Sequence, residues 1–370
     1  MSATGSHDAS NANGAAYARV PELRIQAPSN ADAFEVLCLQ AADNGRGKVL
    51  FGDSLGRART LARPFMAAME FPSVYLEFPL AGKPFLDVTV LYSNGGPGHP
   101  IESEAAAGTE EVIAWFAKEC AQHANVSFGF ELDTSKQQLP AVAIHFQPRT
   151  HKELVQPFCE HVGEPERAAL YLELADRMPQ GWPLSFFGMF RGRPNSPLRA
   201  CGYLSLNEAD ECASDPRRLP AVFKAVGFSA FDNTMLEQIR TLMSVTSNAL
   251  DFQFDVLSDG SIGDTFAIDV QFHIEQPDAV QASFSTGELA PLMRLLEGWG
   301  IADARWKLGV ESAFARAIRV VPRGESDRYS FTLMPQWAKV RWKNGVLQPA
   351  KLYLFGEGWL QWLIERAKSA

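Results

Sequence analysis

Four titratable side chains alternate with apolar neighbours in the sequence, and acid–base catalysis is the chemistry that such residues could perform. Glu77 and Asp87 lie on either side of one turn, and His145 and His273 lie in two later segments. A carboxyl group that faces an apolar, aromatic cavity has a raised pKa, which suits a general base. Histidine titrates near neutral pH and transfers protons readily. The candidate catalytic residues are therefore Glu77, Asp87, His145 and His273.

More polar side chains share the alternating positions of these candidates, and together they would form one polar face. Like charges crowded on facing strands destabilise a sheet unless something compensates them. A cationic ligand, such as an amine or a guanidinium, would do so; an open sheet with one solvated face is the alternative. The histidines and carboxylates lack the close spacing of a metal site, so no metal ligands are indicated. The candidate substrate-binding residues on this face are Tyr75, Glu131, Asp251, Gln253, Asp255, Asp269 and Gln271.

The elements that would position these residues are strands, because apolar and polar residues alternate with a period of two. Turn-forming Gly, Pro, Asn and Asp separate the members of each strand pair. The five predicted pairs are Ser73–Leu80 with Phe85–Ser93, Val126–Asp133 with Ala141–Gln147, Leu184–Arg191 with Leu198–Leu206, Leu250–Leu257 with Thr265–Ile274, and Tyr329–Trp342 with Ala350–Phe355.

Segments with helical periodicity lie between the strand pairs, so the order α-β-β-α recurs about five times. A long series of antiparallel hairpins must cover its edges, and closure into a barrel removes them. We therefore expect an α+β fold: a ten-stranded antiparallel barrel with helices outside and a polar lumen. The expected helices are Ala31–Ala42, Gly56–Glu70, Thr109–His123, Lys152–Val162, Pro165–Arg177, Leu219–Val226, Asn233–Val245, Thr286–Trp299, Asp303–Arg319 and Trp359–Lys368.

Length and composition fit one large domain. Of 370 residues, 46% are hydrophobic and 21% are charged, which is the balance of a globular protein. We expect a single domain over residues 31–370, after a small, polar and disordered tail over residues 1–30. A net charge of −9 argues against a nucleic-acid partner. No apolar stretch suits a membrane span or a secretory signal, and five cysteines lack C-x-x-C spacing, so a cytoplasmic location without membrane contact is expected.

The repeated αββα order, from about Phe65 to Phe355, resembles that of the ABBA, or PT-barrel, prenyltransferases. Two short segments add a local likeness, R-A-C-G-Y at Arg199–Tyr203 and A-K-L-Y-L at Ala350–Leu354. In that family, inward Lys/Arg-x-Tyr patterns hold a prenyl diphosphate, and the tyrosines shield the allyl cation. The resemblance implies a donor site made of Arg199, Tyr203, Lys339, Arg341, Lys351 and Tyr353.

The resemblance also implies an activity. The protein would be a prenyltransferase of natural-product biosynthesis, moving a prenyl group from a prenyl diphosphate to an acceptor inside the lumen. Glu77 or Asp87, on the first hairpin, would take the acceptor proton. The acceptor would be aromatic or cationic, as a small molecule or a peptide. No cofactor would be required; magnesium is possible, but no D-D-x-x-D motif indicates it.

One feature departs from the family pattern, because the predicted lumen carries more acidic residues than a diphosphate pocket is expected to tolerate. Two alternatives therefore stay open. The first is a PT-barrel enzyme of natural-product or peptide biosynthesis that performs acid–base chemistry without a prenyl donor. The second is a barrel that binds a ligand and catalyses nothing, since a fold does not fix a function.

Overall fold

The computed structural model describes residues 23–27, 30–68, 73–93, 101–102, 106–119, 123, 126–134, 142–148, 150–190, 196–274, 279–320 and 328–360. Most of the expected N-terminal tail and residues 361–368 of the expected last helix lie outside these ranges. The expected tail over residues 1–30 is wrong at its end, because Leu23–Ala27 form strand β1.

Ten strands of the described chain pair antiparallel in a closed circle, as predicted. Each sequence-adjacent hairpin pairs with the next, β13 pairs with β2, and β9 pairs with β11 to close the sheet. The circle contains β2 (Ser73–Pro79), β3 (Asp87–Ser93), β4 (Ser127–Leu132), β5 (Val142–Gln147), β6 (Leu184–Phe190), β7 (Leu198–Leu204), β8 (Leu250–Val256), β9 (Ile262–Gln271), β11 (Arg328–Lys343) and β13 (Lys351–Leu360).

The long strand β11 belongs both to the closed barrel and to an extension of the sheet that includes β10 and β1. Its second half, from Trp337 to Lys343, pairs with β9 and closes the barrel. Its first half pairs with β10 (Phe314–Val320), which pairs in parallel with β1, while β12 (Val346–Leu347) folds back on its end. The prediction of a helix over Asp303–Arg319 is therefore wrong after Glu311. Alanine and arginine favour helix in that segment, but backbone pairing with β11 overrides the preference.

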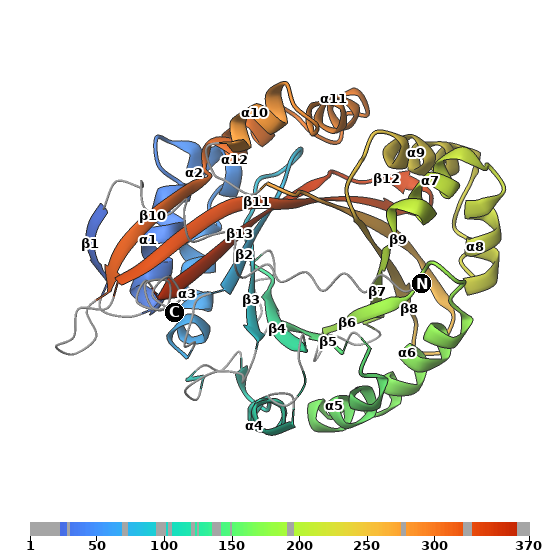
Figure 1. Cartoon of the computed structure of the whole chain (residues 1–370). Helices are drawn as coiled ribbons and strands as arrows, with labels where there is room; N and C mark the ends of the chain where they lie inside the picture. Colours follow the sequence, from blue (N-terminus) through green and yellow to red (C-terminus); the bar gives the residue numbers. More distant parts are fainter. Residues whose placement is uncertain are drawn as a thin grey trace, which may run out of the picture.

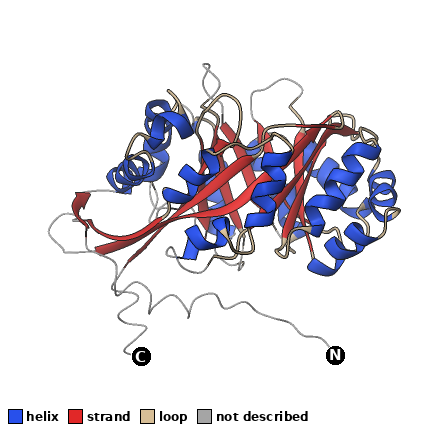
Figure 2. Ribbon diagram, turned by 90° about the horizontal axis from the view of Figure 1, so that it is seen from above, coloured by secondary structure: helices blue, strands red, loops and turns tan. Residues whose placement is uncertain are grey.

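Helices surround the barrel on its outside (Figure 1), and Figure 2 shows the same arrangement from above. The predicted helix over Thr286–Trp299 corresponds to α11 alone and begins at Ala290. The helices α2, α7 and α10 were not predicted, and Trp359 and Leu360 of the expected last helix belong to β13. The helices are α1 (Asn30–Ala41), α2 (Arg46–Phe51), α3 (Leu55–Ala67), α4 (Glu110–Glu119), η4 (Lys152–Leu154), α5 (Val155–Val162), α6 (Glu166–Arg177), α7 (Leu206–Ser214), α8 (Arg218–Val226), α9 (Asn233–Ser244), α10 (Val280–Ser285), α11 (Ala290–Gly298) and α12 (Arg305–Glu311). No helix in the described ranges is both long and apolar enough to span a membrane.

The hydrophobic core lies between the strands and the helices. In β4, Phe128 packs on Phe116 of α4 with ring centroids 4.4 Å apart, and Phe130 packs on Phe65 of α3 at 5.0 Å. These aromatic side chains are fully buried. Because successive strand residues point to opposite faces, the alternate polar residues point into the barrel.

We predict that adjacent residues of β8 differ sharply in their contribution to stability. Phe254 lies among Phe223, Phe228 and Phe266, so Phe254→Ala should lower the free energy of unfolding by about 3–5 kcal/mol. Gln253→Ala, on the lumen side, should cost about 1 kcal/mol, because it removes only one hydrogen bond. Chemical denaturation of both variants measures the difference, and equal losses would contradict the assignment of faces.

Candidate active site

Lysine 351 lies beside two acidic side chains in the lumen, because β13, β2 and β3 are neighbours. Its Nζ donates a hydrogen bond to Glu77 Oε1 and lies 3.8 Å from Asp87 Oδ2. Tyr353, on the same face of β13, stands directly opposite Glu77 in the strand register. Asp87 also accepts a hydrogen bond of 2.9 Å from the backbone N–H of Thr134. The two predicted general bases therefore share one cation.

Burial and these neighbours shift the pKa values of the group. Burial raises the pKa of Asp87 to about 8 against the opposing effect of Lys351, and Glu77 raises it further. For Lys351, burial alone would lower the pKa, but Glu77 and Asp87 outweigh it and the pKa lies above its ordinary value. Burial, followed by Glu77, holds the pKa of Tyr353 well above its usual range. Asp87 is thus largely protonated at neutral pH and Lys351 stays charged.

A second charged group joins β4, β5 and β7. Glu131 Oε2 lies 2.8 Å from His145 Nε2 and accepts a hydrogen bond of 3.0 Å from Arg199 Nη1. Burial would raise the pKa of Glu131, but Arg199 and His145 outweigh it and hold that pKa well below its ordinary value. Gly188 of β6 makes room for the imidazole, because a Cβ there would lie 2.7 Å from the ring of His145. Asp255 stands opposite Arg199 on β8.

A third group lies at the β9–β11 junction. Lys339 Nζ lies 3.3 Å from Asp269 Oδ2, directly across the two strands, and donates to Gln253 Oε1 at 3.3 Å. The same ammonium lies 5.4 Å from the centre of the Tyr353 ring, within reach of a cation–π contact. Burial raises the pKa of Asp269 even though Lys339 opposes it. Nearby, Gln271 donates to Asp251 Oδ2 at 3.0 Å.

Aromatic rings line the lumen next to these charges. Trp337 lies between Tyr75 and Tyr353, with ring centroids 4.5 and 5.2 Å away and the rings tilted by 39° in both pairs. Tyr75 also packs on Phe355 at 4.7 Å. Glu357 follows on the same face of β13, and burial raises its pKa to about 7. The lumen therefore has a charged part and an aromatic part, and Tyr353 belongs to both.

The cations expected to form one patch are mostly paired with carboxylates. Lys351, Arg199 and Lys339 each have an acidic partner, whereas the side chain of Arg341 has no hydrogen bond or ion pair among the described residues. The excess of acidic residues is smaller than the sequence suggests, because raised pKa values leave some carboxyls protonated near neutral pH.

Three buried polar atoms on the lumen face have no hydrogen-bond partner among the described residues. They are Arg199 Nε, Asp269 Oδ1 and Trp337 Nε1. Buried polar groups in proteins are nearly always hydrogen-bonded. A polar ligand in the lumen would meet a donor on the Arg199 side and on the Trp337 side, and an acceptor at Asp269.

Comparison with known proteins found no matching family model and no curated protein similar in sequence. Solved structures do match. A 6-dimethylallyltryptophan synthase from Micromonospora olivasterospora, in complex with DMASPP and Trp, superposes with a TM-score of 0.51 at 13% identity, over 88% of this chain and 97% of that one. The prenyltransferase PriB in its apo form gives 0.51 at 12%, over 88% and 95%. This chain has the PT-barrel fold. The predicted fold is therefore confirmed.

Two predicted site residues of this PT-barrel lie apart from the charged groups. His273 is exposed, so its predicted place in the lumen is wrong: β9 ends at Gln271, two residues before it. Tyr203 is 51% exposed at the end of β7, where it lines a surface hollow with Met178 and Pro183. In the strand register it stands opposite Asp251, so it lies on the lumen face but at the exposed end of the strand.

The sequence reasoning missed two residues that shape the site. Glu357 continues the alternation of Lys351, Tyr353 and Phe355, but the glycines on either side of it suggested that the strand had ended. Gly188 gave no signal by itself, because only the register opposite His145 reveals its role.

We predict that Asp87 makes the stability of the protein depend on pH. Its folded-state pKa of about 8 exceeds the ordinary value of 3.8, so its ionisation opposes folding as the pH rises between these values. Asp87→Asn should therefore gain stability relative to the unmodified protein over this interval, by at most about 1.4 kcal/mol per pH unit. Denaturation at several pH values measures this gain. The exposed Asp210→Asn is the control, and parallel curves for Asp87→Asn and the unmodified protein would contradict the shift.

Proposed function

We propose that this protein transfers a prenyl group from a prenyl diphosphate to an aromatic acceptor inside the barrel. The observation that carries the proposal is the position of Tyr353, whose ring lies under the Lys339 ammonium while Lys351 shares its strand face. Cations that can hold a diphosphate thus adjoin rings that can face a carbocation, in a barrel whose fold matches solved prenyltransferase structures.

The donor diphosphate would bind to Arg341, Lys339, Lys351 and Arg199. Arg341 has no described partner and is available without breaking an existing ion pair. The other three would exchange carboxylates for phosphate oxygens, which form equally strong charge-assisted hydrogen bonds. Protonation of Asp87 lowers the repulsion that the incoming anion meets.

Prenyl transfer would then begin with cleavage of the allylic C–O bond. The electron pair leaves with the diphosphate, and the cations stabilise the charge that develops on it. The ring faces of Tyr353, Trp337 and Tyr75 would stabilise the allyl cation and exclude water from it. The acceptor carbon attacks this cation, and its proton passes to Glu77, the carboxylate that Lys351 holds in place. Asp87 could take the proton instead only above its pKa of about 8, where it is ionised.

The acceptor class and the requirements of the reaction are part of the proposal. An aromatic acceptor is favoured because the rings of Tyr75, Trp337 and Phe355 offer stacking surfaces. A cationic small molecule or a peptide would also find carboxylates nearby, at Glu357 and Asp251. We propose that no cofactor is needed, since protein cations neutralise the diphosphate. A reducing cytoplasmic setting is supported by four free, buried cysteines among the described residues.

One observation favours a second candidate, acid–base chemistry without a prenyl donor. Three lumen cations are already paired with carboxylates, and His145 with Glu131 and Arg199 forms a hydrogen-bonded group that can move a proton. The third possibility, a ligand-binding barrel without chemistry, is disfavoured by the shifted pKa values in the lumen, which are typical of catalytic sites.

We predict that dimethylallyl diphosphate binds with a dissociation constant on the order of 10 µM. Arg341→Ala should weaken this binding about tenfold or more, because a charge-assisted contact to phosphate is worth about 1.5–3 kcal/mol. Lys343→Ala is the matched control, since Lys343 lies two residues further along β11 and is exposed. Isothermal titration calorimetry with dimethylallyl and geranyl diphosphates, with and without Mg²⁺, measures these affinities.

The outcome of this titration separates the candidates. Binding that Arg341→Ala weakens and Lys343→Ala leaves intact supports the donor site. Prenyl transfer would be rejected if neither diphosphate gave a heat of binding while the same protein preparation bound a cationic acceptor, such as an arginine-containing peptide. This outcome would favour the acid–base alternative.

We predict that Glu77→Gln separates donor binding from catalysis. The substitution removes a negative charge next to Lys351, so the affinity for dimethylallyl diphosphate should stay the same or rise. The transfer rate should fall about 10²–10⁴-fold if Glu77 removes the acceptor proton. The assay uses aromatic acceptors that include tryptophan, with release of diphosphate as the readout. A Glu77→Gln variant with an unchanged rate would exclude Glu77 as the base.

A further inference from the structure

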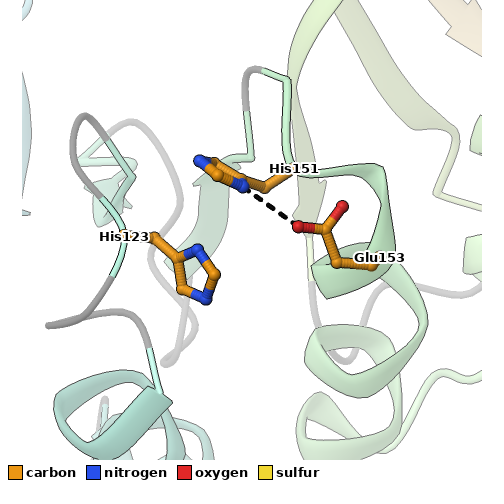
Figure 3. Close-up of side chains that lie close together, drawn as sticks. All are labelled: His123, His151 and Glu153. Carbon is orange, nitrogen blue, oxygen red and sulfur yellow. Dashed lines mark hydrogen bonds and ion pairs between the residues drawn. The ribbon is translucent and has the colours of Figure 1, made fainter.

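Two histidines and a glutamate meet outside the barrel, although the sequence indicated no metal ligands. Figure 3 shows His123, His151 and Glu153 converging from two separate chain segments. One ligand atom from each lies within 4.8 Å of the other two. The imidazole rings of the histidines have centroids 4.6 Å apart, and His151 Nδ1 lies 3.0 Å from Glu153 Oε1.

The β4–β5 pairing explains why these residues meet. Ser127, the first residue of β4, pairs with Gln147, the last residue of β5, and their side chains are hydrogen-bonded at 3.0 Å. His123 precedes Ser127 by four positions and His151 follows Gln147 by four positions. The histidines therefore leave the same end of the hairpin at matched distances, and Glu153 in η4 faces back toward them (Figure 3).

The three side chains match the ligand preference of a divalent transition metal. Imidazole nitrogen and carboxylate oxygen bind Zn²⁺ at about 2.0–2.2 Å, and tetrahedral geometry then puts neighbouring ligand atoms roughly 3.3 Å apart. The separation of 3.0 Å between His151 and Glu153 is already close to that spacing. His123 needs a movement of about 1–2 Å to reach it, and water can fill the fourth position.

Exposure permits a metal ion to enter. The His151 side chain is 30% exposed and that of Glu153 is 64% exposed, while His123 is half-buried. Both histidines are neutral ligands and Glu153 supplies one negative charge, so a bound dication would leave a single positive charge facing solvent. Among the described residues, His151 is the only ion-pair partner of Glu153.

We propose that His123, His151 and Glu153 bind a divalent transition-metal ion, with Zn²⁺ as the test ion, and that this ion fastens the open end of the β4–β5 hairpin. The site is separate from the lumen and does not depend on the proposed prenyl transfer. Its expected effect is structural, because β4 and β5 carry Glu131 and His145 into the barrel.

We predict that the full-length, untagged protein binds one Zn²⁺ ion with a dissociation constant on the order of 1–10 µM. His123→Ala and His151→Ala should each weaken binding about tenfold or more, and Glu153→Gln somewhat less. Zinc should also raise the thermal midpoint of the unmodified protein and not that of His123→Ala. Calorimetry with zinc chloride measures the affinity, and differential scanning fluorimetry measures the thermal midpoint of unfolding.

Three control variants test where the metal binds. His273→Ala removes an exposed histidine elsewhere and should leave the affinity unchanged. His145→Ala tests the lumen, and Cys120→Ser removes a thiol that lies outside the described residues. Loss of binding in any of these three, with His123→Ala and His151→Ala unaffected, would overturn the proposal. The absence of zinc binding to folded protein would overturn it as well.

Discussion

The backbone pairing of β9 with β11 is the constraint on which the rest of the structure depends. It turns a row of hairpins into a closed barrel and leaves one face of every strand pointing inward. Charged side chains on that face are removed from bulk water, and an unpaired charge there would be costly. The Lys339–Asp269 pair lies directly across this junction, so the pairing that closes the barrel also joins one cation of the site to its carboxylate.

Closure also sets the electrostatic character of the site. Three cations and their carboxylates neutralise one another, and burial keeps further carboxyls protonated near neutral pH. The resting lumen is therefore close to balanced instead of strongly acidic. A ligand that binds to the paired side chains must replace an internal ion pair with contacts at least as strong, so the charged part of the lumen favours a compact polyanion or a cation.

The sequence predicted the five hairpins and their two faces, because period-two alternation is a local property that each strand carries by itself. The sequence-based prediction was wrong where the local alternation of residues does not match the backbone pairing. His273 keeps the alternation but lies past Gln271, where the register of β9 with β11 ends. Glu357, in contrast, remains paired on both sides of its strand although a glycine stands on either side of it in the sequence. The contact of Lys351 with Glu77 depends on a register between distant segments, which alternation does not encode. The meeting of His123 and His151 depends on register in the same way.

The β13–β2 pairing has a consequence for how the chain reaches its native state. β2 ends at Pro79 and its partner β13 begins only at Lys351, so the edge of β2 stays unpaired until the long segment between them has been synthesised. The edge of β9 stays unpaired for a shorter time, because β11 begins at Arg328. Pairings between distant segments form slowly, and open sheet edges recruit other strands. The nascent chain therefore carries the unpaired edge of β2 throughout the synthesis of the segment from β3 to β13, and the yield during expression should depend on chaperones that shield this edge.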